Sequence, residues 1–123
     1  MPKAALRAKR FDAPDEVREF TGGKGRVELV EMEGNAIGRG TFEPGWRWSE
    51  HVKPLAGTDS CQVGHIGYVL EGRMNVLMDN GEQLEVGPGD AFHMPPGHEA
   101  WIVGDEPCVL LDFGGLKGYA QGG

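Results

Sequence analysis

The residues of this chain best suited to chemistry are its four histidines and two cysteines. One of them, His98, follows a proline-glycine turn in the stretch MPPGHEAW. Imidazole is the commonest side-chain metal ligand, and it is equally a hydrogen-bonding group at turns. Because side chains alternate along a strand, His98 and Ala100 are expected to point to the same face, roughly 6.6 Å apart along the backbone. His98 is therefore either a metal ligand or a polar residue at a turn.

The cysteines and one further histidine have different surroundings. Cys61 lies in an irregular loop, where its thiolate could be a fourth metal ligand or a redox-active group, and the alternative is an ordinary buried thiol. Cys108, in the apolar run PCVLLDF, is predicted to be a core residue. In the run AFHMP, alternation places the phenylalanine and the methionine inside the fold and His93 outside it.

Short strands and tight turns are expected to position these residues, because the chain has 21 glycines and 8 prolines without low complexity. One short helical turn is predicted over residues 12–20, where Asp12 can cap it and Pro14 suits the first turn. Strands are predicted at 25–32, 36–42, 64–70, 73–78, 82–86, 91–95, 98–103 and 108–113. Residues 53–64 form the one long irregular connection. This spacing is typical of an all-β sandwich or barrel.

The run from PGWRWSEH through HIGYVLEG to GPGDAFHMPPGHEAW resembles the cupin superfamily of small jelly-roll β-barrels. The family has a first motif of a glycine, five residues, His-x-His and a later glutamate, and a second motif Gly-x5-Pro-x-Gly-x2-His. The resemblance covers about residues 42–113 and implies a single-domain, all-β, cupin-type jelly-roll β-barrel. We expect a short N-terminal arm at 1–24, the barrel at 25–114 and a flexible glycine-rich tail at 115–123.

The metal-binding positions of the family carry over only in part. His51 occupies the first histidine position, separated from Gly45 by five residues, and Lys53 occupies the second. His65 falls where the family usually has glutamate, and Ala100 falls on the last ligand position. Two of the four positions therefore hold histidine.

We predict that the metal ligands of this cupin-like site differ in position from those of the family motif. The resemblance, together with strand alternation, indicates His51, His65 and His98 as the ligands of one divalent transition metal per chain. Three neutral imidazoles suit zinc, iron, copper, nickel or manganese, and the family puts Fe(II) first. Lys53 is either a substrate-binding cation or part of a salt bridge at the rim.

The resemblance implies two classes of function. The first is a metal-dependent enzyme, either a dioxygenase-like oxidoreductase or an isomerase or lyase, acting on a small oxygenated metabolite. The second is a module that binds a metal or a small ligand without turnover, as in sensory cupin domains. Oxygen uptake with small acids, diketones and phenols distinguishes them.

Composition limits the partners. A net charge of -7 argues against nucleic acid, and no apolar run is long enough to span a membrane. The basic amino terminus lacks the apolar stretch of a signal peptide, and two cysteines make no disulfide framework, so we expect a cytoplasmic location. A small-molecule ligand is expected. Residues 25–32 are predicted to form a free sheet edge, which favours a homodimer.

Overall fold

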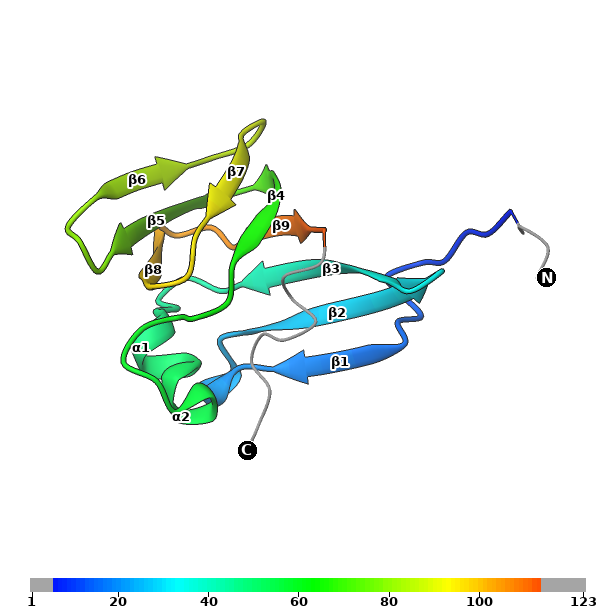
Figure 1. Ribbon diagram of the computed structural model, residues 1–123, viewed down its shortest axis with the longest axis horizontal. Coiled ribbons are helices and arrows are strands. Elements are labelled where there is room, and N and C mark those ends of the chain that lie inside the picture. Colours follow the sequence, from blue (N-terminus) through cyan, green and yellow to red (C-terminus); the bar gives the residue numbers. More distant parts are fainter. Residues whose placement is uncertain (1–5, 114–123) are drawn as a thin grey trace.

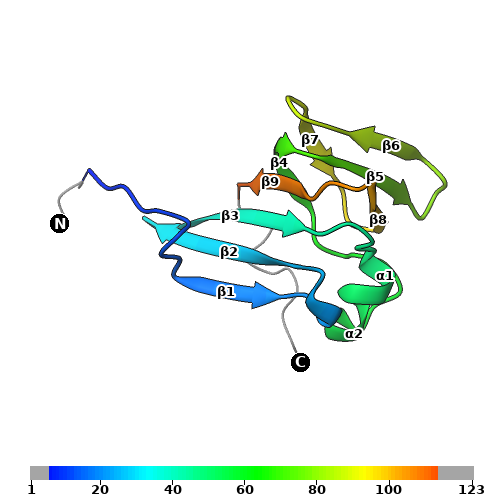
Figure 2. The same cartoon turned by 180° about the vertical axis from the view of Figure 1, so that it is seen from behind.

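The computed structural model describes residues 6–113, which form two antiparallel sheets that pack face to face (Figure 1). The larger sheet has the strand order β1-β2-β3-β9-β4-β7, and the smaller has the order β6-β5-β8. Figure 2 shows from behind that the smaller sheet covers only the end of the larger sheet that contains β4, β7 and β9. The strands are β1 Glu16–Glu19, β2 Gly25–Met32, β3 Asn35–Phe42, β4 His65–Glu71, β5 Arg73–Met78, β6 Gln83–Val86, β7 Ala91–Met94, β8 His98–Val103 and β9 Cys108–Asp112.

The all-β prediction is confirmed, and β2 with β3 and β5 with β6 form antiparallel hairpins. Burial alternates along β3 and β8, as expected for strands with one face on a core. Glu33 and Gly34, with φ values of 50° and 79°, connect β2 to β3, because a two-residue turn of this kind needs positive φ at both positions. The strands form two separate sheets, and closure into a barrel stays a prediction.

The amino-terminal part differs from the prediction in two ways. Residues 16–19 form β1 rather than a helical turn, because pairing with β2 satisfies their backbone, whereas one isolated helical turn is unstable. The predicted free edge at residues 25–32 is wrong as well, since β1 and β3 lie on either side of β2. The edges of the larger sheet are β1 and β7.

Three short helical segments connect the strands: η1 Thr21–Gly23, α1 Trp48–His51 and α2 Lys53–Ala56. Neither α1 nor α2 is predicted from the sequence. Pro54 stands in the first turn of α2, and Gly57, with φ 75° in the left-handed region, ends it. The core between the sheets includes Trp46 and Trp48, each only 1% exposed.

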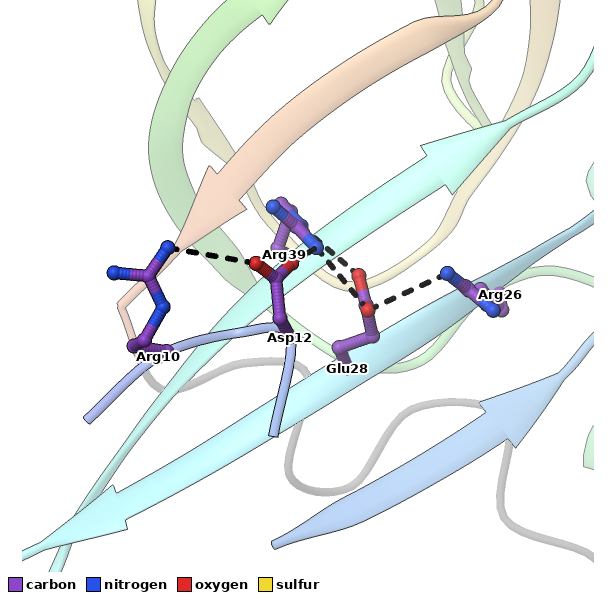
Figure 3. A network of polar contacts seen from close by, with 5 residues as sticks. All are labelled: Arg10, Asp12, Arg26, Glu28 and Arg39. Atoms are coloured by element: carbon purple, nitrogen blue, oxygen red, sulfur yellow. Dashed lines mark hydrogen bonds and ion pairs between the residues drawn. The ribbon is translucent and has the colours of Figure 1, made fainter. Parts of the chain in front are cut away.

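A polar network lies on the outer face of the larger sheet (Figure 3). Glu28, buried on β2, accepts two hydrogen bonds from Arg39 on β3, of 2.9 and 3.1 Å, and Arg26 lies 3.5 Å from the same carboxylate. Asp12 contacts Arg39 at 3.5 Å, which connects the residues before β1 to this face. These contacts raise the pKa of Arg39, with the hydrogen bonds to Glu28 as the largest cause.

Candidate metal centre

Three side chains from three segments meet between the sheets. Cys61 comes from the loop after α2, His65 is the first residue of β4, and His98 is the first residue of β8. One ligand atom from each lies within 4.8 Å of the other two. All three are buried, with exposed fractions of 3%, 7% and 3%. One metal ion could be coordinated by the sulfur and the two imidazole nitrogens together at this separation.

The backbone fixes Cys61 against the beginning of β8. The Cys61 N–H donates to the His98 carbonyl at 2.7 Å, and the Gly97 N–H donates to the Cys61 carbonyl at 2.7 Å. These hydrogen bonds form an isolated antiparallel bridge, in which Cys61 pairs with His98 as residues of neighbouring strands do. The cysteine is therefore positioned by main-chain geometry rather than by its own packing alone.

Hydrogen bonds fix the orientation of both imidazoles. His98 Nδ1 lies 2.7 Å from the Pro95 carbonyl oxygen, which can only accept, so Nδ1 carries the proton. His65 Nδ1 lies 2.6 Å from Asp112 Oδ2, and Asp112 is only 1% exposed. Each ring is thus left with Nε2 as its ligand atom, the arrangement found behind metal-binding histidines in proteins. Burial also lowers the pKa of His98 and favours the neutral imidazole that metals require.

Without a cation, Cys61 is a protonated thiol. Burial raises its pKa to about 11, and its Sγ lies 3.8 Å from His65 Nε2. The Trp48 indole N–H makes no hydrogen bond of ordinary geometry, yet it lies near this sulfur and favours the thiolate, against the effect of burial. A bound cation would take the place of the thiol proton.

A cavity of about 30 Å³ lies beside the two histidines and has room for one or two water-sized molecules. His65, His98 and Asp112 are its polar lining. The rest of the wall is apolar and consists of Phe42, Trp46, Trp48, Met74, Phe92, Met94, Ala100 and Leu110. A wider groove of about 350 Å³ lies beyond Met94, which lines both spaces. His93, Glu82, Gln83 and several apolar side chains line this outer groove.

Comparison with known proteins identifies the family. The profile described as "Cupin domain" matches residues 57–114, the part of the chain that carries Cys61, His65 and His98. This part of the chain is a cupin domain.

Solved structures share the fold of this cupin at low sequence identity. A protein of unknown function from Acinetobacter has a TM-score of 0.58 at 16% identity, over 80% of this chain and 89% of its own. A cupin-like protein from Thermotoga maritima has a TM-score of 0.53 at 21% identity, over 77% and 70%. A transcriptional regulator of the HTH_3 family from Vibrio cholerae has a TM-score of 0.55 at 19% identity, over 78% and 53%. No curated protein matches the chain in sequence.

The structure of this cupin places the two other residues from the first motif elsewhere. His51 ends α1, where its Nδ1 lies 3.0 Å from the backbone nitrogen of Arg47, and it is not part of the cluster of Cys61, His65 and His98. Lys53 lies in α2, with its Nζ 3.6 Å from Asp59, so it forms the salt bridge that the sequence leaves as one alternative.

The burial predicted for His98, His93 and Cys108 agrees with the structure. His98 and Ala100 are both buried on one face of β8, and His93 is exposed on β7. Cys108 is fully buried in the core. Cys61 belongs to the cluster, and its spacing of four residues from His65 is the sequence signal for this pairing, since short chelating loops commonly supply two metal ligands. No helix among residues 6–113 is long and apolar enough to cross a membrane.

Proposed function

We propose that this cupin binds one transition-metal ion per chain through Cys61 Sγ, His65 Nε2 and His98 Nε2. The observation that carries the proposal is the meeting of these three buried donors within 4.8 Å, with each imidazole Nδ1 already engaged. The donor set fits a metal because two imidazole nitrogens and one sulfur lie close together, and these donor types bind first-row transition metals. The proposal keeps two of the three histidines predicted from the sequence and takes Cys61 in place of His51.

Three protein ligands leave a coordination position open, as in catalytic rather than structural sites. A metal here would supply Lewis acidity toward a substrate oxygen and, with a redox-active ion, electron transfer. Asp112 holds the His65 ring in one orientation, and the apolar wall excludes bulk water. On this basis we propose a metal-dependent enzyme, either a dioxygenase-like oxidoreductase or an isomerase or lyase, acting on a small oxygenated metabolite.

The sizes of the two spaces indicate where such a metabolite would bind. The inner cavity of about 30 Å³ admits only water-sized molecules, whereas about 350 Å³ in the outer groove matches the lower end of small-molecule pockets. Met94, between the two, would have to change rotamer for the metabolite to reach the metal. Methionine suits this role because its side chain is unbranched and flexible.

A second candidate function is a binding or sensory module without turnover. The similarity in fold to a transcriptional regulator favours it, because the match extends over 78% of this chain and about half of the regulator. Oxygen uptake by the metal-loaded protein with small acids, diketones and phenols separates the two functions. Uptake with any of them contradicts a pure binding module, and saturable binding of a compound without product favours it.

The metal site itself is tested by elemental analysis of the purified full chain. We expect near one metal ion per chain in the wild type and loss of most of it in His98→Gln. His51→Gln is the matched control and should keep its metal, because His51 lies outside the cluster. Loss in His51→Gln as well would instead support the three-histidine set predicted from the sequence. A wild type that carries no metal, even after reconstitution, contradicts the proposal.

We also propose that the chain forms a homodimer. Because β2 is not an edge, the support now comes from the outer face of β4. Ile66, Tyr68 and Leu70 are 56%, 40% and 42% exposed there, and a row of apolar side chains in the middle of a sheet is typical of an interface. A second copy of the chain would cover this face.

A further inference from the structure

The donors of the proposed site are soft. The cupin motif usually combines imidazoles with a carboxylate, whereas His65 stands in the glutamate position here and a thiolate joins the cluster. The carboxylate of Asp112, which lines the cavity beside the cluster, is engaged with His65 Nδ1 at 2.6 Å. Thiolate and thioether ligands select copper or zinc, while carboxylate and water suit harder ions.

A thioether lies beside the same cavity. Met94 is the direct antiparallel partner of His65 in the pairing of β4 with β7, so their Cα atoms are about 4.5–5.5 Å apart. Met94 is only 6% exposed, and it lines the cavity together with His65 and His98. Its sulfur is therefore a candidate for a fourth, weak donor.

The other methionine of the cavity is less well placed. Met78 is the strand partner of His98, and Met74 lies four residues before it on β5. Four residues of extended chain span about 13 Å, so Met74 joins the wall at a greater distance from the cluster. Met74 thus provides a matched control for Met94 within one cavity.

We propose that the metal of this site is copper, held by Cys61, His65 and His98 with the Met94 thioether as a weak fourth donor. This inference rests on the metal site proposed above and adds the identity of the ion. Two imidazoles, one thiolate and a distant methionine form the donor set of copper sites in which the thiolate dominates the spectrum. The largely apolar wall fits copper in its reduced state, which accepts few ligands.

The test uses the metal-free full chain. It is loaded with one equivalent of Cu(I) without oxygen and then oxidised with ferricyanide, which takes one electron per copper and becomes ferrocyanide. We expect an intense visible absorption band from the bond between the thiolate and Cu(II), and its absence in Cys61→Ser. Met94→Leu should shift the band maximum, and Met74→Leu should leave it in place. Exchanges of methionine for leucine conserve volume, so both variants are expected to fold.

The outcomes separate this inference from the metal site itself. Zinc bound at one ion per chain, lost in His98→Gln and not displaced by stoichiometric copper, would keep the metal site and overturn the assignment of copper. Copper binding without the visible band, or a band that survives in Cys61→Ser, would also overturn it. Equal shifts in Met94→Leu and Met74→Leu would overturn the role of Met94. Binding of neither metal would overturn both proposals.

Discussion

The two histidines of the cluster differ in their relation to the family motif, but the Nδ1 atoms of both rings are hydrogen-bonded in the same way. His65 occupies a motif position, whereas His98 is displaced by two residues from one. Each nevertheless donates its Nδ1 proton to an oxygen atom, which belongs to the buried Asp112 carboxylate for His65 and to the Pro95 carbonyl for His98. This shared arrangement, rather than the motif count, is what distinguishes both from an ordinary polar residue at a turn.

Asp112 provides the test of this arrangement at the level of one residue. Asp112→Asn should weaken metal binding by about 10–100-fold, because an amide cannot hold the His65 ring in one tautomer as a carboxylate does. Competition with a chromophoric chelator measures the affinity. Asp90→Asn is the control, since the Asp90 carboxylate accepts the Gly87 N–H at 2.8 Å in an exposed turn and is not part of the cluster. Equal affinities in wild type and Asp112→Asn would show that Asp112 does not position His65.

Two of the three residues of the cluster could be predicted from the sequence, and the reason is physical. Alternation along β8 places His98 on the same face as Ala100, a ligand position of the family motif, and His65 falls on the motif position of the glutamate. His51 is predicted from its position in the family motif, but here the segment forms α1 and His51 lies outside the cluster. The sequence leaves the role of Cys61 open, because the four-residue spacing to His65 permits a shared metal but the thiol is placed by a bridge between a loop and β8, a long-range contact.

At the level of elements, hairpins were predictable and short helices were not. The residue types of a turn such as Glu33-Gly34 indicate its conformation. By contrast, residues 16–19 have a plausible helix start, and only the neighbouring β2 decides that they form a strand. Helices of four residues, such as α1 and α2, depend on packing more than on propensity.

Gly67 on β4 allows β9 to pack closely against β4. A Cβ on Gly67 would lie 1.9 Å from the Leu111 carbonyl oxygen and 2.8 Å from Phe92 Cζ. Gly67→Ala should therefore force the strands apart and lower the free energy of unfolding by about 3 kcal/mol or more. Gly64→Ala is the control, because its Cβ would meet nothing closer than 3.5 Å. Urea unfolding compares the two, and equal stabilities would contradict the close packing of β4 on β9.

The polar network in Figure 3 predicts that the Glu28 carboxylate contributes more to the free energy of unfolding than the exposed carboxylate of Glu85 does. Glu28→Gln should cost about 2–4 kcal/mol, because it removes the buried carboxylate that accepts two hydrogen bonds from Arg39 and leaves Arg39, among the described residues, only the exposed carboxylate of Asp12. The control, Glu85→Gln, removes the partner of Arg73 in an exposed pair and should cost less than about 1 kcal/mol. Thermal unfolding of both variants measures the difference. A similar small loss in both would mean that the buried pair adds no more than the exposed one.

For the whole molecule, the exposed face of β4 leads to a prediction about assembly. The wild type should have the mass of a dimer in light scattering at micromolar concentration, and Ile66→Lys should be monomeric, because a buried charge opposes association. Leu84→Lys, at an equally exposed side chain in the outer groove, should remain dimeric. A monomeric wild type would contradict the homodimer, and a monomeric Leu84→Lys would place the interface elsewhere.

The bridge between Cys61 and the start of β8 has a consequence for the way an ion enters. Because main-chain bonds at 2.7 Å already join Cys61 to Gly97 and His98, the donors are assembled before any ion arrives. Loading should therefore change the circular dichroism little, and the amide protons of Cys61 and Gly97 should exchange slowly with solvent in the metal-free chain as well. The rate of uptake would then be set by passage of the ion through the apolar wall, and not by refolding of the polypeptide.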